Sequence, residues 1–281
     1  MSDPFRITGP AIISFSGGRT SAYMLHRIIQ AHGGTLPDDV IPVFANTGRE
    51  MPATLDFVRD CSAAWGINVV WLEFTGRRTD GFQAVNHNSA ARSGEPFEVL
   101  LSAQSALPNP VQRSCTQELK IRTMKRWVRV SLGWERWTNV VGLRADEMNR
   151  VDRVRQAKRR ERWTVAMPLA DAGVTNADVM AFWRAQPFDL RLTGKWEGNC
   201  DGCFLKSRAA MMRMLRDHPE RMQWWADMEA VPRGTSGRGR RFRKDREPYA
   251  ELARIAAATP MLLPDETMIE GGELCEAYCG V

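Results

Sequence analysis

Five of the six cysteines lie in glycine-rich or polar surroundings, where metal ligands and reactive thiols are usually held. Cys200 and Cys203 form a Cys-x-x-Cys pair in a glycine-bearing turn. This spacing is a common half-site for Zn²⁺ or an iron–sulfur cluster, and it also occurs in redox-active thiol pairs. The other three are Cys115, Cys275 and Cys279. The sixth cysteine, Cys61, lies in an apolar helical pattern, and we expect it in the core.

A glycine-containing loop, residues 14–21 with the sequence SFSGGRTS, follows an apolar β-branched stretch and precedes apolar residues at helical spacing. Strand, glycine turn and helix in this order aim backbone N–H groups and a helix N-terminus at an anion. The glycines permit a positive φ and close approach to a phosphate. The loop residues that could contact the anion are Ser14, Ser16, Gly17, Gly18, Arg19 and Ser21. The alternative is a tight strand-to-helix turn that binds no ligand.

Alternating strands and helices are the pattern that must position these residues. Apolar β-branched stretches predict strands at residues 11–13, 40–45, 67–74 and 138–143. Helical spacing predicts helices at residues 22–29, 52–65, 116–130, 171–186 and 207–230. Residues 75–114 are polar and punctuated by Gly, Asn and Pro, so we expect loops with short helices there. The predicted fold class is α/β, a parallel sheet flanked by helices, with a helical C-terminal region.

Polar loops follow three of the predicted strands. They are the SFSGGRTS loop, residues 46–50 (NTGRE) and residues 144–150 (RADEMNR). In parallel sheets, ligands bind beyond the carboxyl ends of the strands. We therefore expect the three loops to converge on one binding site.

The overall composition is that of a soluble globular protein. A chain of 281 residues can form one large α/β domain, or one domain with a small appendage. Its hydrophobic content of 43% and charged content of 26% are ordinary. No apolar run is long enough to span a bilayer, and the first residues lack the apolar stretch of a signal peptide. We therefore expect a cytoplasmic location, no membrane partner and reduced thiols.

The net charge of +6 is concentrated in two basic clusters, residues 150–162 and 233–246. Such clusters are typical of proteins that bind a nucleotide or a nucleic acid, although each could also be a solvated surface. The second cluster is interrupted by Gly and Ser and is almost without apolar residues. We expect it to form a mobile loop.

Four segments in one order resemble a known family. The SFSGGRTS loop looks like the pyrophosphate-binding PP-loop of the adenine nucleotide alpha-hydrolase-like superfamily. Three further segments are similar to parts of the phosphoadenylyl-sulfate (PAPS) and adenylyl-sulfate (APS) reductases. They are residues 46–58 (NTGREMPATLDFV), 142–150 (GLRADEMNR) and 167–183 (MPLADAGVTNADVMAFW).

The resemblance covers about residues 10–205. It implies a Rossmann-like, PP-loop nucleotide-binding domain over residues 1–205. Residues 206–281 would then form a helical C-terminal region, with a basic loop at about 231–247 and a cysteine-bearing tail.

The same resemblance implies specific nucleotide contacts. Phosphate contacts are implied for Ser16, Gly17, Gly18 and Ser21. Positions beside the nucleotide are implied for Asn46, Thr47, Gly48 and Arg49. Nucleotide binding is also implied for Gly142 and Arg144. Arg144 and Arg150 would act as catalytic residues at the anionic end, because guanidinium groups suit phosphate or sulfate better than lysine does. The alternative for Arg144 is an ion pair with Asp146 or Glu147.

The cysteine layout resembles that of the cluster-bearing APS reductases, in which a Cys-Cys pair precedes a Cys-x-x-Cys pair. Here Ser114-Cys115 stands at the place of the first pair. The resemblance implies a [4Fe–4S] cluster, with zinc as the alternative, bound by Cys115, Cys200, Cys203 and Cys275. Cys279 would then be the nucleophile of the C-terminal tail. In a second interpretation Cys279 is the fourth ligand and the tail has no nucleophile, and in a third both terminal thiols are idle.

Two enzymatic functions and one binding function follow from these features. The first is a PAPS/APS reductase-like oxidoreductase of sulfur metabolism that uses a thioredoxin-like reductant. The second is an ATP-dependent PP-loop sulfurtransferase that modifies tRNA or DNA, which the basic clusters favour. Thr20 stands where ATP-cleaving PP-loops carry aspartate, so the sequence predicts nucleotide binding more firmly than ATP cleavage. The third is a regulator without enzymatic activity, and a homo-oligomer remains open for all three.

Overall fold

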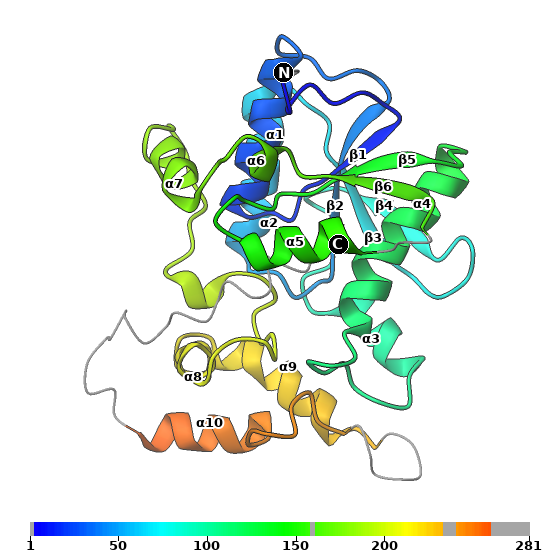
Figure 1. Cartoon of the computed structure of the whole chain (residues 1–281). Coiled ribbons are helices and arrows are strands. Elements are labelled where there is room, and N and C mark those ends of the chain that lie inside the picture. The colour runs from blue at the N-terminus through cyan, green and yellow to red at the C-terminus, as the bar shows by residue number, and fades with distance from the viewer. Residues whose placement is uncertain (1–2, 158–160, 233–239, 260–281) are drawn as a thin grey trace.

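The computed structural model describes residues 3–157, 161–232 and 240–259. Within these ranges a six-stranded sheet lies in the upper part of the molecule (Figure 1), with strand order β4-β3-β2-β1-β5-β6. The strands are β1 (Ala11–Ser14), β2 (Val40–Asn46), β3 (Val70–Phe74), β4 (Phe82–Val85), β5 (Trp137–Val140) and β6 (Trp163–Ala166). All neighbouring pairs are parallel except β3 and β4, which are antiparallel. The predicted α/β class with a mainly parallel sheet is confirmed.

Helices cover both faces of this sheet. Three helices share a core with one face: α1 (Arg19–Ala31), α2 (Pro52–Trp65) and α7 (Asn176–Arg184). On the other face lies α4 (Thr123–Ser131). Ile13 of β1 belongs to the first core and its neighbour Ile12 to the second. Because side chains alternate along a strand, a strand covered on both faces is apolar throughout, which is why this stretch was predictable.

A third group of helices lies below the sheet in Figure 1. It contains α8 (Arg208–Asp217), α9 (Pro219–Ala230) and α10 (Tyr249–Ala258), and it shares a core with α3 (Glu95–Ser102). Phe97, Phe204 and Trp225 are fully buried in this core. The core therefore takes residues from both sides of position 205, and the domain boundary expected there stays a prediction.

Several elements differ from the sequence-based prediction. The strands β4 and β6 were not predicted, because each has four residues and lies at an edge of the sheet. The predicted helix 207–230 is two helices, since Pro219 has no N–H to continue the hydrogen bonds of α8 and instead begins α9. The predicted helix 116–130 begins as a π-helix, η1 (Thr116–Arg122), and continues as α4. Three short elements complete the described chain: α5 (Met148–Gln156), α6 (Pro168–Asp171) and the 3₁₀ turn η2 (Lys195–Glu197).

The expected mobile loop at 231–247 is partly corrected. Residues 233–239 lie outside the described ranges. Beyond them, Phe242 is fully buried, 4.9 Å from the ring of Trp225 and 6.0 Å from that of Phe204. The buried Phe242 ring holds residues 240–247 against the core that α3, α8, α9 and α10 share. The basic composition of the segment gave no indication of this buried ring. In the described part of the chain, no helix combines the length and the apolar character needed to cross a membrane.

Candidate functional site

A pocket opens at the carboxyl edge of the sheet, where the strand order reverses between β1 and β5. This reversal is the topological switch point at which open α/β sheets bind ligands. We call the cavity the switch-point pocket, and its empty volume is about 640 Å³. Its polar lining residues are Ser14, Ser16, Gly18, Thr20, Ser21, Lys120, Gly142, Arg144, Glu147 and Arg150.

The glycine loop between β1 and α1 forms one wall of the switch-point pocket. Gly17 has a φ of +80°, and a Cβ at this position would lie 2.7 Å from Thr54 Cγ2 of α2. Glycine is required because both the left-handed backbone and the close contact exclude a side chain. The hydroxyl oxygens of Ser16 and Ser21 lie 2.9 Å apart, and Ser21 Oγ also donates to Gly18 O at 3.0 Å. Both predicted phosphate-binding serines thus lie on the wall, whereas Gly17 shapes the loop without lining the pocket.

The first turn of α1 is open to a ligand. Gly18 is the N-cap, and no side chain caps the helix there. The N–H groups of a first helical turn have no partner within the helix, so an anion can take the place of a cap. Gly142, after β5, lies next to this turn, since a Cβ at this position would be in van der Waals contact with Ser21 Cα at 3.4 Å.

Arg144 and Arg150 line the opposite side, together with Glu147. Arg144 Nη1 donates to Thr20 Oγ1 at 3.2 Å, and Arg144 Nε donates to Asp146 Oδ1 at 2.9 Å. The Glu147 carboxylate accepts from the Arg144 backbone N–H at 2.9 Å and pairs with the Arg150 guanidinium. Arg144 therefore lines the pocket and also makes the ion pair with Asp146 that was the alternative from the sequence.

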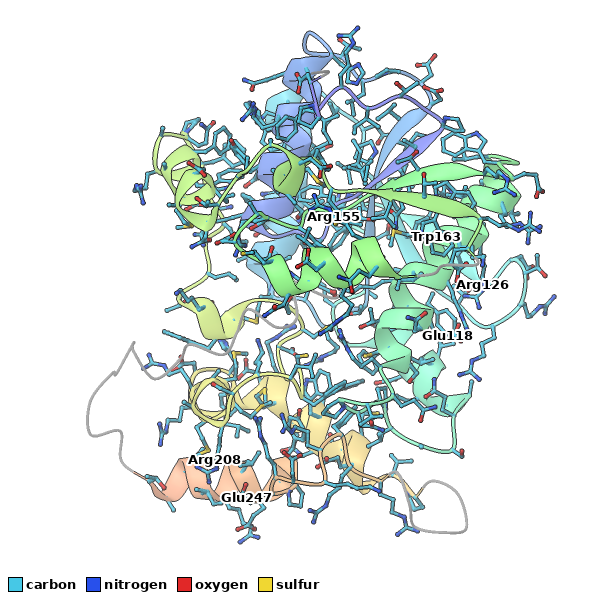
Figure 2. The ribbon with its side chains drawn as sticks, in the orientation of Figure 1. Glu118, Arg126, Arg155, Trp163, Arg208 and Glu247 are labelled. Carbon is cyan, nitrogen blue, oxygen red and sulfur yellow. The ribbon has the colours of Figure 1, made fainter. Side chains whose placement is uncertain are left out.

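Lys120 is a third cation on the pocket wall, and its role was not predicted. It is buried on η1, and its Nζ lies 3.5 Å from Glu50 Oε1. Along the same continuous helix, the buried Glu118 carboxylate pairs with Arg122 at 2.6 Å and with Arg126 at 3.1 Å, and Figure 2 labels Glu118 and Arg126. Among the residues that the structure describes, three cations, Lys120, Arg144 and Arg150, line the pocket against the single carboxylate of Glu147, which favours an anionic ligand.

An apolar surface completes the switch-point pocket. It consists of Phe15, Val43, Ala45, Met124, Val141 and Leu143. Small-molecule sites usually combine apolar walls with polar groups that fix the orientation of the ligand. A ligand with a flat apolar part and a strongly anionic part matches this lining.

Arg19 makes an ion pair away from the switch-point pocket, and its expected contact with the nucleotide stays a prediction. Its guanidinium donates to both carboxylate oxygens of Asp189, at 2.7 and 2.9 Å, and to Leu190 O at 2.8 Å. Arg19 is not among the residues that line the switch-point pocket. The Arg19 guanidinium pairs with the carboxylate of a residue that lies 170 residues further along the chain, and only the fold brings the two groups together.

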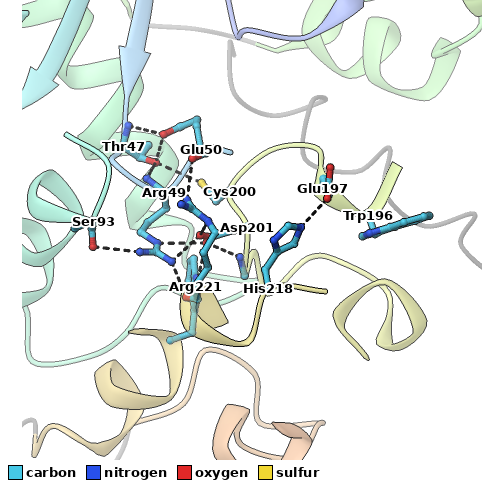
Figure 3. Close-up of polar contacts among 12 residues, drawn as sticks. Thr47, Arg49, Glu50, Ser93, Trp196, Glu197, Cys200, Asp201, His218 and Arg221 are labelled. Carbon is cyan, nitrogen blue, oxygen red and sulfur yellow. Dashed lines mark hydrogen bonds and ion pairs between the residues drawn. The ribbon is translucent and has the colours of Figure 1, made fainter. Parts of the chain in front are cut away.

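The loop after β2 also makes contacts outside the switch-point pocket. Asn46, Thr47, Gly48 and Arg49 do not line the switch-point pocket. The Asn46 amide donates to Glu73 at 2.6 Å, and Arg49 is buried against Asp201 at 2.6 Å (Figure 3). Asn46 thus bonds to β3 and Arg49 to the cysteine loop, and the position beside the nucleotide expected for these residues stays a prediction.

A second cavity lies beside the first. We call it the cysteine pocket, because Cys115, Cys200 and Cys203 all line it, and its empty volume is about 400 Å³. Its walls are mainly apolar, with Phe97, Phe204, Leu205 and Trp225. Lys120 lines both cavities, so the two pockets meet at this residue.

The predicted metal site is only partly placed. Three of its four expected ligands meet at the cysteine pocket, but within residues 3–157, 161–232 and 240–259 no set of three His, Cys, Asp or Glu side chains is arranged to hold a metal ion. Cys275, the expected fourth ligand, and Cys279, the expected nucleophile, lie outside these ranges. The metal assignment stays a prediction.

Sequence reasoning missed Lys120, Thr20 and Glu147 as pocket residues. Two features of the sequence could have indicated them. Lys120 lies on the basic side of the predicted helix after Cys115, and Thr20 and Glu147 lie within the segments that resemble the family. None of these signals shows which side of the backbone a side chain occupies.

Comparison with known proteins agrees with this architecture. A sequence model described as the phosphoadenosine phosphosulfate reductase domain matches residues 10–190, from β1 through α7. The chain is also 30% identical over 203 residues to an uncharacterized nin region protein, ORF290, of Escherichia phage lambda. That match covers 70% of this chain and 66% of the phage protein, just under two thirds of its length. The chain belongs to the phosphoadenosine phosphosulfate reductase domain family, within the PP-loop adenine nucleotide alpha-hydrolase-like superfamily.

Proposed function

We propose that this chain is a sulfonucleotide reductase-like enzyme. An adenine nucleotide would bind in the switch-point pocket, and thiol chemistry would take place beside it. The observation that carries the proposal is the position of Lys120, which lines both the switch-point pocket and the cysteine pocket. A residue that lines both cavities sets the switch-point pocket next to the three thiols, so a bound nucleotide and thiol chemistry would be neighbours.

The lining of the switch-point pocket supports an adenine nucleotide as the ligand. The adenine would pack on the apolar surface that includes Val43 and Val141. The α-phosphate would accept from the first turn of α1 and from the Ser16 and Ser21 hydroxyls. The sulfate end would lie toward Arg144, Arg150 and Lys120, whose charges stabilise the departing nucleotide.

The covalent step proposed here uses Cys279. Its thiolate would attack the sulfur of the bound sulfonucleotide, and the bond from that sulfur to the phosphate oxygen would break. AMP, or its 3′-phosphate, leaves with the electron pair, and a thiosulfonate remains on Cys279. One thiolate of a thioredoxin-like dithiol then attacks the Cys279 sulfur, and sulfite leaves with the electron pair of the S–S bond. The second thiol of the dithiol breaks the resulting mixed disulfide, which frees Cys279 as a thiol and leaves the dithiol as a disulfide. The dithiol thereby supplies the two electrons that reduce sulfate to sulfite.

A metal group in the cysteine pocket is a separate part of the proposal. The three thiols are by their chemistry the donors that an iron–sulfur cluster or zinc takes, although among the described residues they are not arranged to hold a metal ion and a fourth ligand is needed. Cys115, Cys200 and Cys203 would hold the group, with Cys275 as the fourth ligand. When bound, a [4Fe–4S] cluster supplies structural and electrostatic support there rather than electron transfer.

The reductase activity is tested with the full-length protein, prepared without oxygen. Incubation with APS or PAPS, thioredoxin and its reductase is expected to release one sulfite for each AMP or AMP 3′-phosphate. Metal analysis and a visible spectrum are recorded on the same sample, where four irons with a broad band near ~400 nm indicate a cluster and one zinc indicates the alternative. Loss of sulfite in the Cys279→Ser variant, with nucleotide binding intact, is the matched control. No sulfite from wild-type protein that carries its metal would refute the reductase proposal.

One observation favours a second function, a sulfurtransferase acting on nucleic acid. The basic helix α5 begins at the switch-point pocket, where Arg150 lines the cavity, and continues to the half-exposed Arg155 (Figure 2). A polyanion lying along α5 would reach the pocket. This function predicts pyrophosphate release from ATP only when tRNA or DNA is present, with binding that weakens steeply as salt increases.

The Glu147→Gln variant is expected to bind APS and AMP about 3- to 10-fold more tightly than wild type. The substitution keeps the shape and a hydrogen-bond acceptor but removes the single negative charge on the pocket wall and frees Arg150 from its ion pair. Isothermal titration at low and high salt measures the change, and the gain should shrink at high salt. Glu135→Gln, an exposed carboxylate paired with Arg162, is the control and should leave affinity unchanged. Weaker binding by Glu147→Gln would show that this carboxylate contacts the nucleotide itself.

A further inference from the structure

Asp201 lies between the two cysteines of the Cys-x-x-Cys pair and is fully buried. Its carboxylate is shared by two guanidinium groups, with Arg49 Nη2 at 2.6 Å and Arg221 Nε at 2.8 Å (Figure 3). The indole N–H of Trp225 donates to the same carboxylate at 2.7 Å. One negative charge thus organises residues from three separate segments: the loop after β2, the cysteine loop and α9.

Backbone contacts follow the same path. The Asp201 N–H donates to Arg49 O at 2.9 Å, and Glu50 and Cys200 form an isolated antiparallel bridge. Arg221 Nη2 donates to Glu50 O at 2.9 Å, which ties α9 to the loop after β2. These contacts hold the Cys200 thiol next to the same loop, where Cys200 Sγ lies 3.5 Å from Thr47 Oγ1.

The charge balance shows why this carboxylate matters more than an ordinary ion-pair partner. The Arg49 side chain is 4% exposed and that of Arg221 16%, so water screens neither charge well. Removing the one carboxylate between them leaves two buried cations facing each other, which is far costlier than losing a surface pair. The segments that these arginines join would separate, and Cys200 would move away from the loop after β2.

We propose that Asp201 is a positioning residue for the cysteine pocket, because its buried carboxylate holds Cys200 against the loop that follows β2. This inference deepens the proposed function, since the cysteine pocket is where thiol or metal chemistry would occur. Asp201 lines neither the switch-point pocket nor the cysteine pocket, so it acts through Cys200 and not on a ligand.

The test is the rate at which Cys200 is alkylated by iodoacetamide in the metal-free full-length protein, measured by peptide mass spectrometry. In Asp201→Asn the rate is expected to rise about tenfold or more, since the cysteine loop opens locally. Cys61 serves as the internal reference, because it is fully buried in α2 and burial raises the pKa of its thiol. An unchanged Cys61 rate shows that the opening is local and that the fold is intact.

Two further variants test the role of Asp201 independently of Asp201→Asn. Arg221→Gln leaves one guanidinium and one carboxylate, a balanced pair that should fold, and is expected to raise Cys200 alkylation about threefold. Glu197→Gln is the matched control, because Glu197 is also buried near this loop but pairs with His218 at 2.6 Å instead of with the loop after β2. It should leave the Cys200 rate within about twofold of wild type.

Two results would overturn the role of Asp201. One is a Cys200 rate that stays at the wild-type value in both Asp201→Asn and Arg221→Gln, and the other is an equal rise in Glu197→Gln. Iron uptake after anaerobic reconstitution is measured in parallel and should fall in Asp201→Asn while AMP affinity is kept. If wild-type protein takes up no metal, the metal part of the proposed function fails, whereas the alkylation rates still decide the role of Asp201.

Discussion

Replacing Arg144 by alanine is expected to weaken the binding of APS and AMP about 100-fold, or about 3 kcal/mol, at low salt. Arg144 is buried and lines the switch-point pocket, where its guanidinium already bonds to Thr20 and Asp146. The substitution removes a charge-assisted donor from the pocket wall and leaves Arg150 as the remaining guanidinium beside the Glu147 carboxylate. Arg144→Lys keeps the charge but not the planar fork, and should lose about tenfold.

Arg19→Ala is the matched control for that experiment. Both arginines follow a strand at the same edge of the sheet, and the sequence placed both at the nucleotide. Because the Arg19 guanidinium bonds to Asp189 and Leu190, Arg19→Ala should change the affinity for APS and AMP no more than about twofold. A slight fall in the free energy of unfolding is compatible with this result. Isothermal titration measures the affinity of the three variants and of wild type for APS and AMP. Thermal unfolding checks that each variant is folded. Equal losses for Arg144→Ala and Arg19→Ala would show that binding rearranges the Arg19 ion pair.

Trp183→Ala is expected to lower the free energy of unfolding by about 3–5 kcal/mol, the largest stability change predicted here. Trp183 of α7 is 1% exposed. Its ring centre lies 4.9 Å from Phe57, 5.8 Å from Phe188 and 6.4 Å from Trp65, so truncation opens a cavity among aromatic rings. The indole N–H also donates to Arg19 O at 2.9 Å, at the first residue of α1. The loss therefore reaches the helix that begins at the pocket.

Urea unfolding of Trp183→Ala and Trp183→Phe separates packing from the hydrogen bond. Trp183→Phe keeps an aromatic ring and loses the bond to Arg19, so about 1–2 kcal/mol should be lost. Trp183→Ala should in addition weaken AMP binding, because the first turn of α1 loses an anchor. A loss below about 1 kcal/mol in Trp183→Ala would mean that the ring cluster closes the cavity without cost.

The predictability of the strands follows their position in the sheet. The central strands β1 and β2 are covered on both faces, and their continuous apolar sequences were recognised as strands. The edge strands β4 and β6 are short and partly exposed, with Gln83 and Thr164 exposed to solvent, and their sequences carry no clear period. Pairing with a neighbouring strand, and not their own pattern, makes them strands.

By itself the sequence determined the features that depend on a few consecutive residues. These are the glycine turn with its two serines, the Cys-x-x-Cys pair, the four apolar strands β1, β2, β3 and β5, and through them the family. Such features follow from the backbone preferences of glycine and proline and from local periodicity, which operate within one or two turns of the chain.

Only the tertiary structure decided which charged groups meet. Arg19 and Arg49 were assigned to a nucleotide from their place in recognised segments, but each pairs with an aspartate more than 150 residues away, Asp189 and Asp201. Lys120 became the link between two pockets because a π-helix after Cys115 sets the direction of its side chain. A guanidinium or ammonium group pairs with whichever carboxylate the folded chain brings within a few ångströms, and separation along the sequence does not reveal that partner.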